Sequence, residues 1–191
     1  LQQIQLFELI ANKISTALNI QPIRHILNTS GIFNYAKYQY EMVRLGIGIY
    51  GVGNSEEEQS SLENVSTLKS IISQIRTVEA NDSIGYSRKF MVKKEMRIAT
   101  IPIGYADGIR RAWGNEKGFV SIKNQKATIL GNVCMDMLMV DVTNITCEER
   151  DEVIIFGETP HVTEIATICQ TIPYEILTSI SQRVKRIFYK N

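Results

Sequence analysis

The segment TIPIGYADGIRR (residues 100–111) has the pattern of a β-strand that stops at a glycine and continues into a polar turn. The apolar residues end at Gly104, and the turn places a single tyrosine, Tyr105, directly after the strand. This tyrosine is either a structural side chain or a phenol positioned to act on a substrate. Because the unperturbed pKa of tyrosine is about 10, a catalytic Tyr105 needs neighbours that stabilise the phenolate. Composition and spacing leave both interpretations open.

Strand patterns separated by turn signals continue on both sides of this segment, from residue 65 to the C-terminus. The predicted strands are 66–79, 97–104, 118–124, 125–133, 137–143, 152–157 and 186–190, with a tight hairpin turn at 123–125. The period of 66–79 also permits a helix. A helix N-capped by Thr163 is predicted at 161–172, and PYEILTSISQRV (173–184) continues it or begins another. This part is therefore mainly β, as a barrel or a strongly bent sheet.

The N-terminal part has a different pattern. LQQIQLFELIANKISTAL has apolar residues at helical spacing and predicts an amphipathic helix over residues 2–18. IRHILN (23–28) and RLGIGIYG (44–51) predict two buried strands, separated by a polar turn and a short helix or loop. This order is typical of a parallel βα unit, which cannot bury both faces of its strands alone. The expected organisation is an α/β piece at 1–52, a polar linker at 53–64 and a β domain at 65–191.

Composition excludes several classes of protein. The 21 basic and 20 acidic residues give a net charge of +1, so no basic field indicates nucleic-acid binding. No apolar run reaches the roughly 18 residues of a membrane span, and the N-terminus lacks the features of a signal peptide. The chain starts inside a predicted helix without methionine, as expected of a piece of a longer protein. Its 3 cysteines are too few for a disulfide framework or a zinc site, which favours a reducing cytoplasm and no metal.

Polar residues at the ends of the predicted strands are the candidate site. Thr29 begins a Thr-Ser-Gly turn that opens a helix and could hold a phosphate, although taken alone the turn favours an ordinary helix cap. His25 is either a ligand or a core histidine, and Arg44 either a functional residue or a solvated charge. Gly46 and Gly48 permit close approach of a ligand to the backbone, or simply close packing.

In the β part, GNVCMDMLMVDV (131–142) interrupts an apolar strand with polar residues. Asp136 and Asp141 are candidates to face a cavity, and the alternative, favoured for Asp141, is a solvated strand face. Cys134 and Met135 are as well explained by a place in the core.

Five segments, in this order, resemble the alanine racemase family. They are HILNTSG (25–31), MVRLGIGIYG (42–51), IPIGYADGIRR (101–111), GNVCMDMLMVDVT (131–143) and IPYEILTSISQRVKRIF (172–188), and together they extend over nearly the whole chain. GYADG followed by CMD is the most specific pair. The resemblance implies a fold-type III pyridoxal 5'-phosphate enzyme, in which a (β/α)₈ barrel precedes a C-terminal β-barrel-like domain. Residues 1–52 would then be the last βα units of the barrel.

The resemblance also implies roles for the residues of the N-terminal part. Thr29 would bind the cofactor phosphate through its hydroxyl, and the N–H groups of Gly46 and Ile47 would hold the same phosphate. Arg44 would donate a hydrogen bond to the pyridine nitrogen and, being always protonated, would leave that nitrogen unprotonated. His25 would hold the Arg44 guanidinium.

In the β domain, the resemblance implies that Tyr105 is one of two opposed bases that interconvert L-alanine and D-alanine, the latter for peptidoglycan. The Met135 backbone would bind the substrate carboxylate. In the family both residues reach the active site of the partner subunit, so a homodimer is expected. GYSRK (85–89) also resembles racemases that are fused to a cell-wall ligase, which would lie upstream.

Several features of the family pattern have no match in this sequence. No segment matches the Schiff-base lysine, which is the second base, or the histidine that usually supports the tyrosine. Gln182 and Phe119 stand where many members have tyrosine. A decarboxylase of the same fold type is disfavoured by GYADG. A non-catalytic dimerisation or binding module derived from such an enzyme remains the alternative function.

Overall fold

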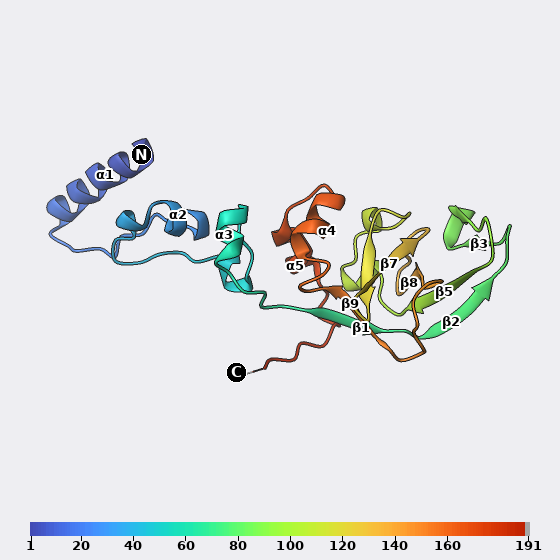
Figure 1. Ribbon diagram of the computed structural model, residues 1–191. Coiled ribbons are helices and arrows are strands. Elements are labelled where there is room, and N and C mark those ends of the chain that lie inside the picture. The colour runs from blue at the N-terminus through green and yellow to red at the C-terminus, as the bar shows by residue number, and fades with distance from the viewer. Residues whose placement is uncertain (190–191) are drawn as a thin grey trace. The chain divides into compact units, whose positions relative to one another are not determined.

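A computed structural model describes residues 1–189, and the chain divides into two compact units, Leu1–Ser66 and Thr67–Asn191. The first unit is helical. It contains α1 (Gln2–Leu18), α2 (Thr29–Asn34), α3 (Glu56–Ser60) and the 3₁₀ turns η1 (Ala36–Tyr38) and η2 (Ile47–Tyr50) (Figure 1). α1 has the predicted bounds, and the left-handed conformation of its C-cap residue Asn19 (φ 50°) lets the Ile20 N–H bond to the Ser15 carbonyl at 3.1 Å.

The two strands predicted in this unit, at 23–28 and 44–51, do not form. The segments meet through the Arg44 N–H, which donates to the Leu27 carbonyl at 3.0 Å, but no ladder is found between them. Residues 47–50 form η2 instead. The physical reason is that a parallel strand is stabilised by neighbours on both sides and by helices on both faces, and this unit supplies neither.

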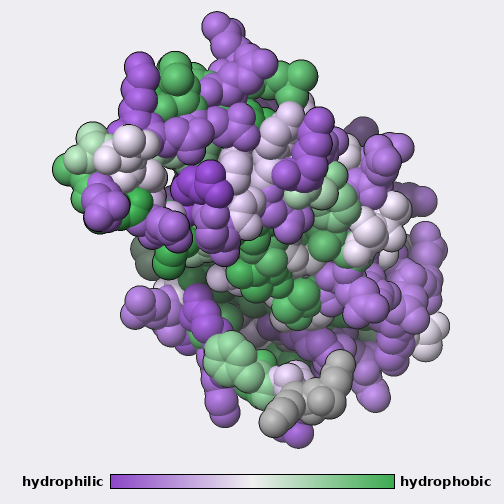
Figure 2. Space-filling view, turned by 90° about the vertical axis from the view of Figure 1, so that its left-hand side faces the viewer, coloured by the Kyte–Doolittle hydropathy of each residue, from purple (hydrophilic) through white to green (hydrophobic). Residues whose placement is uncertain are grey.

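Apolar residues of α1 remain exposed because this unit lacks the neighbouring strands and helices that would cover them. Four of them have relative exposures between 44% and 56%: Leu6, Leu9, Ile10 and Ile14. Exposed hydrophobic side chains are visible among hydrophilic ones on the face drawn in Figure 2. The predicted linker 53–64 contains α3, which begins at the N-cap Ser55, so part of this polar segment has regular structure.

The second unit is built on a seven-stranded antiparallel sheet of order β1-β9-β6-β7-β8-β5-β2. Its strands are β1 (Leu68–Ile71), β2 (Gln74–Val78), β5 (Met96–Ile101), β6 (Phe119–Ile122), β7 (Gln125–Leu130), β8 (Leu138–Asp141) and β9 (Glu152–Phe156), and β3 (Ser83–Ile84) pairs with β4 (Phe90–Met91). The two edge strands, β1 and β2, follow each other in the chain with only Ile72 and Ser73 between them. The edges of the sheet therefore lie close together, and the sheet curls as Figure 1 shows.

The single strand predicted at 66–79 is thus two strands with different partners. β1 pairs with β9 and β2 pairs with β5. Between them, the Ile72 N–H donates to the Asp151 carbonyl and the Ser73 N–H donates to the Thr100 carbonyl. The chain therefore changes partner at this point, a tertiary effect that the local pattern does not reveal.

Local turn chemistry explains the best-predicted part of the sheet. β6 and β7 form a hairpin whose two turn residues, Lys123 and Asn124, both have positive φ (49° and 62°), as a type I′ turn requires. The predicted turn at 123–125 is confirmed.

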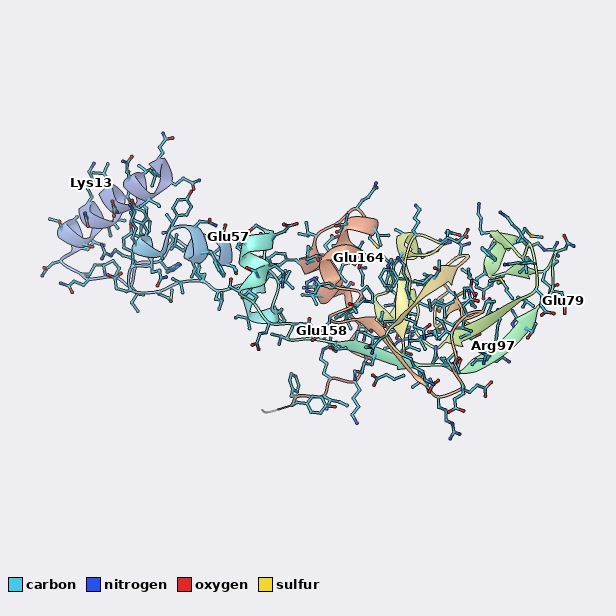
Figure 3. The ribbon with its side chains drawn as sticks, in the orientation of Figure 1. Lys13, Glu57, Glu79, Arg97, Glu158 and Glu164 are labelled. Atoms are coloured by element: carbon cyan, nitrogen blue, oxygen red, sulfur yellow. The ribbon has the colours of Figure 1, made fainter. Side chains whose placement is uncertain are left out.

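On β5, the Arg97 side chain (labelled in Figure 3) donates hydrogen bonds to the carbonyls of Ile145 and Cys147 and so fixes the loop after β8.

The core of this unit consists of fully buried isoleucine, leucine and valine side chains and the only tryptophan, Trp113, which is 1% exposed. Gly118 permits this packing because a Cβ atom there would lie 2.1 Å from Trp113 Cδ1. β-Branched residues dominate because they pack well on a pleated surface.

Two helices follow β9: α4 (Val162–Ile168) and α5 (Pro173–Ser179). α5 is a new helix with Pro173 in its first turn. The N-cap predicted at Thr163 is wrong: His161 is the N-cap, and its ring nitrogen accepts from the Thr163 N–H. The strand predicted at 186–190 does not form over residues 186–189, because no sheet edge pairs with it, and Lys190 lies outside the described residues.

Candidate functional site

The strand β5 ends in the turn that contains Tyr105. After Ile101 the chain passes through Gly104 into the short 3₁₀ turn η4 (Tyr105–Asp107) and reaches Gly108, whose φ is 106°. The Tyr105 side chain is 44% exposed. Its hydroxyl forms no hydrogen bond within residues 1–189, so the position of the ring depends on the backbone of the turn.

A second turn, at residues 134–137, is paired directly with the first. The Tyr105 N–H donates to the Cys134 carbonyl and the Ala106 N–H donates to the Met135 carbonyl, both at 2.9 Å. Gly104 permits this approach, because a Cβ there would lie 2.3 Å from the Cys134 oxygen and 2.4 Å from the Met135 oxygen. The structure thus brings Tyr105 and Met135 together.

The Met135 backbone N–H is a free hydrogen-bond donor within residues 1–189. The residue is 53% exposed, and its N–H has no hydrogen-bond partner in the part of the chain that the structure describes. An amide that is free to donate, next to an exposed phenol, can bind an anionic group while the phenol takes or gives a proton. The neighbouring Cys134 is buried, and burial raises the pKa of its thiol.

Arg183 connects these two turns, which sequence analysis did not predict. Its Nε donates to Asp107 Oδ1 at 2.7 Å and its Nη2 donates to Asp136 Oδ1 at 2.5 Å. Burial of Asp107 alone would raise the pKa of its carboxyl, but the Arg183 guanidinium and the Gly104 N–H lower it more, so the net pKa is lowered. Arg183 is 76 positions from Asp107, and no local pattern indicates such a pair.

Asp141, the other aspartate considered in this region, does not join the cluster. Its Oδ1 accepts from the N–H of Thr143 at 2.8 Å and from the hydroxyl of Thr143 at 2.6 Å, so it closes a local turn at the end of β8. Phe119 is buried in β6 with Lys126 Nζ 3.9 Å from its ring centroid, and Gln182 is exposed.

In the first unit, backbone N–H groups converge on Thr29. The residue is 2% exposed, and its hydroxyl oxygen accepts from the N–H of Gly46 at 3.1 Å and of Gly48 at 3.4 Å. The Ile47 N–H between them has no partner within the described residues. A Cβ on Gly48 would lie 2.8 Å from Thr29 Cγ2, so only glycine leaves this space open. The Ile47 N–H and the hydroxyl hydrogen of Thr29 are donors without an acceptor in the described residues and fit a phosphate, whereas the amides of Gly46 and Gly48 are bonded to the Thr29 oxygen.

Arg44 is close in sequence to this group and makes no hydrogen bond to His25 within the described residues. The Arg44 Nη2 donates to the Ile26 carbonyl at 3.1 Å, and the His25 side chain is exposed. Asn28 caps α2 by accepting from the Gly31 N–H, so the helix-cap role falls to Asn28 and not to Thr29.

Glu58 is a buried charge near the Thr29 turn that sequence analysis missed. Its carboxylate accepts from the Asn54 N–H at 2.8 Å and from Ser30 Oγ at 3.2 Å. The Asn54 N–H is the main cause of its lowered pKa. Ser55 followed three residues later by Glu58 is a capping-box pattern that could have revealed α3.

Residues 1–189 contain neither a metal-binding cluster nor a membrane-spanning helix. No group of three or more His, Cys, Asp or Glu side chains is placed to hold a metal ion. No helix in this range is both long enough and apolar enough to cross a membrane.

Comparisons with known proteins match both units. Residues 65–188 match the family described as alanine racemase, C-terminal domain, and residues 1–54 match alanine racemase, N-terminal domain. Alanine racemase of Halothermothrix orenii is 40% identical over 177 residues, which is 89% of this chain and 46% of the relative. Alanine racemase of Helicobacter pylori strain P12 is 38% identical over 177 residues, covering 86% of this chain and 47% of the relative.

Solved structures agree with these matches. Alanine racemase from Streptomyces coelicolor A3(2) has a TM-score of 0.90 at 28% identity, covering 99% of this chain and 51% of that one. The Clostridium difficile 630 enzyme in complex with cycloserine has a TM-score of 0.89 at 35% identity, covering 96% and 50%. The Bartonella henselae structure, described as having covalently bound pyridoxal phosphate, has a TM-score of 0.81 at 33% identity, covering 95% and 51%.

The matches define a class of protein, the pyridoxal phosphate-dependent amino-acid racemases. Within it, the chain belongs to the alanine racemase family. The resemblance stated from the sequence is confirmed, as is the fold class: the last units of a (β/α)₈ barrel and a C-terminal β domain. The chain spans about half the length of the relatives that it matches.

Proposed function

We propose that the protein to which this chain belongs interconverts L-alanine and D-alanine with pyridoxal 5'-phosphate and supplies D-alanine for peptidoglycan. The observation that supports it best is the hydrogen-bonded pairing of the Tyr105 turn with the Met135 turn, since the first carries an exposed phenol and the second an N–H without a partner in the described residues. The phenol of Tyr105 takes or returns the α-proton on one face of alanine. The Met135 N–H binds the substrate carboxylate and orients the Cα–H bond.

The residues of the first unit bind the cofactor in this proposal. The hydroxyl of Thr29 and the N–H groups of Gly46 and Ile47 hold its phosphate, and Arg44 donates a hydrogen bond to its ring nitrogen. Pyridoxal phosphate, when bound, supplies the electron sink that makes the α-proton of alanine acidic enough to leave. His25 steadies the Arg44 side chain in the complete barrel, although no hydrogen bond joins the two within residues 1–189. The fit rests on the donor set around Thr29, which contains hydroxyl and amide groups.

Three further elements complete the proposal. The enzyme acts as a homodimer in which Tyr105 serves the partner's site, it works in the cytoplasm, and a cell-wall ligase is fused upstream. The second base is the Schiff-base lysine of the family, and no segment of this chain matches the family segment that contains it. The domains are proposed as 1–52 (barrel), 53–64 (linker) and 65–191 (β domain).

The test replaces Tyr105 by phenylalanine in the whole polypeptide that the gene encodes. Because general base catalysis contributes about 10²–10⁴-fold, Tyr105→Phe should lower the rate of racemisation by that factor in both directions. Tyr174→Phe is the control, since Tyr174 has nearly the same exposure (42% against 44%) and lies on α5.

Two outcomes oppose the proposal. If Tyr105→Phe racemises alanine at nearly the wild-type rate, Tyr105 is not the base. If the unmodified protein does not racemise alanine but forms a stable dimer, the alternative of a non-catalytic dimerisation or binding module is favoured.

A further inference from the structure

Three segments that are far apart in the sequence are joined by hydrogen bonds at the Tyr105 turn. They are the turn 104–108, the turn 134–137 and the C-terminal segment 179–184. The first two contain the proposed substrate-contacting groups. The third contains Arg183, to which the family resemblance gives no role.

Arg183 joins the other two segments by charged hydrogen bonds. Nε and Nη2 of one planar guanidinium donate to Asp107 and Asp136, at 2.7 Å and 2.5 Å. Asp107 is two residues after Tyr105, and Asp136 directly follows Met135. A guanidinium has the rigid fork needed to hold two carboxylates at a fixed separation, and an ammonium group does not.

The backbone reinforces this connection on the Tyr105 side. The Ser181 N–H donates to the Asp107 carbonyl at 3.0 Å, and the Ser179 hydroxyl donates to the Gly108 carbonyl at 3.2 Å. The other carboxylate oxygen of Asp107 accepts from the Gly104 N–H at 2.8 Å. Asp107 is 8% exposed, and a buried carboxylate that loses its cation is poorly solvated. Loss of Arg183 should therefore disturb the turn itself.

We propose that Arg183 is a positioning residue that sets the separation of the Tyr105 phenol and the Met135 N–H by holding Asp107 and Asp136. The inference rests on the proposed function. No hydrogen bond to the Tyr105 hydroxyl is found within the described residues, so the backbone of the turn, which Asp107 holds through Gly104 and Arg183, sets the point from which the phenol extends. A displacement of about 1 Å at a reacting group can reduce the rate about 10²-fold.

The first experiment measures racemisation by Arg183→Met and Arg183→Lys in the whole gene product. Arg183→Met should lower kcat about 10²-fold, and Arg183→Lys should lower it less, because lysine can pair with one carboxylate at a time. Lys123→Met is the matched control. Its ion pair with Asp151 has similar exposure (49% and 18%, against 50% and 11% for Arg183 and Asp107) but lies at the β6–β7 hairpin.

A double-mutant cycle separates positioning from general stability. In a Tyr105→Phe background, Arg183→Met should lower kcat by less than about threefold, because there is no longer a base to misplace. A further loss of about 10²-fold in that background would overturn the proposal, as would an Arg183→Met enzyme with wild-type kcat. If wild-type racemisation or its dependence on Tyr105 is absent, the proposed function has failed and not the positioning role alone.

A measurement on the chain without cofactor supplies the second readout. Amide hydrogen exchange at Tyr105 and Ala106 should become about tenfold faster in Arg183→Met, while exchange in β6 and β7 stays unchanged. If Arg183→Met does not fold, Asp136→Asn decides, since Asp136 is exposed and its loss removes one arm of the connection. Unchanged exchange and kcat in Asp136→Asn and Arg183→Lys would refute the inference.

Discussion

Replacement of Gly104 by alanine should destabilise the β domain at the two paired turns. The added Cβ would overlap the carbonyl oxygens of Cys134 and Met135, at 2.3 Å and 2.4 Å. Both are backbone atoms, so no side-chain rotation relieves the overlap. Gly104 has extended backbone angles (φ −149°, ψ −160°) that alanine can adopt, and the effect is therefore steric and not conformational.

The expected cost follows from what the overlap breaks. Separating the turns removes the hydrogen bonds from Tyr105 N–H to Cys134 and from Ala106 N–H to Met135, at about 1 kcal/mol each. Displacement of packed backbone adds about 1–3 kcal/mol, for a total of about 3–5 kcal/mol. A domain has a free energy of unfolding of about 5–15 kcal/mol, so the loss is a large fraction of it.

Urea unfolding followed by the fluorescence of Trp113 measures this loss, because Trp113 is the only tryptophan and is buried in the β domain. With a slope of about 2 kcal/mol per molar urea, the midpoint should fall by about 1.5–2.5 M. Gly157→Ala is the control: its nearest neighbours are side-chain atoms of Thr67, at 3.0 Å and 3.2 Å, which can move. Equal midpoints for the two variants would refute the close approach of the turns.

Two further predictions concern the same domain. Because the pKa of Asp107 is lowered in the folded chain, the ionised carboxylate stabilises the fold above a pH of about 4, and this contribution is lost as the pH falls through the folded pKa. In urea titrations, the free energy of unfolding of Asp107→Asn should therefore depend less on pH in the acid range than that of the unmodified protein. An unaltered pH dependence would count against the Arg183 pair. Asn124→Val should lower the free energy of unfolding by about 1–2 kcal/mol, because a β-branched residue must then adopt the positive φ of the hairpin turn. Asn124→Gly should be tolerated, since glycine adopts this conformation readily. Similar urea midpoints for the two variants would contradict a type I′ turn.

The elements that local patterns determine could be predicted from the sequence. The period of α1 and the turn at Lys123 and Asn124 each depend on a few adjacent residues, and both agree with the structure. The strands at 23–28 and 44–51 could not be predicted correctly in this chain, since their apolar patterns suit strands that have neighbours on both sides. The break between β1 and β2 at Ile72 also depends on distant partners.

The candidate site was predictable to a different extent. Tyr105 and Met135 follow from motifs that resemble the racemase family, and the structure places their turns together. Their exact roles stay predictions. Asp136 was considered for a cavity, but its pairing with Arg183 was not foreseen, because ion pairs between residues far apart in sequence have no local signal. Glu58 had a local signal, the capping-box spacing from Ser55.

The Tyr105 turn depends on the completed β domain and not on its own sequence. Its N–H groups bond to the turn after β7, and its buried carboxylate bonds to Arg183, which follows the last helix, α5. GYADG alone therefore cannot fix the phenol. The C-terminal segment must reach Asp107 before the turn has its final geometry, so a substitution near residues 181–183 can impair a base that it does not touch. The backbone position from which the exposed Tyr105 side chain extends is therefore set by contacts with residues distant in the sequence.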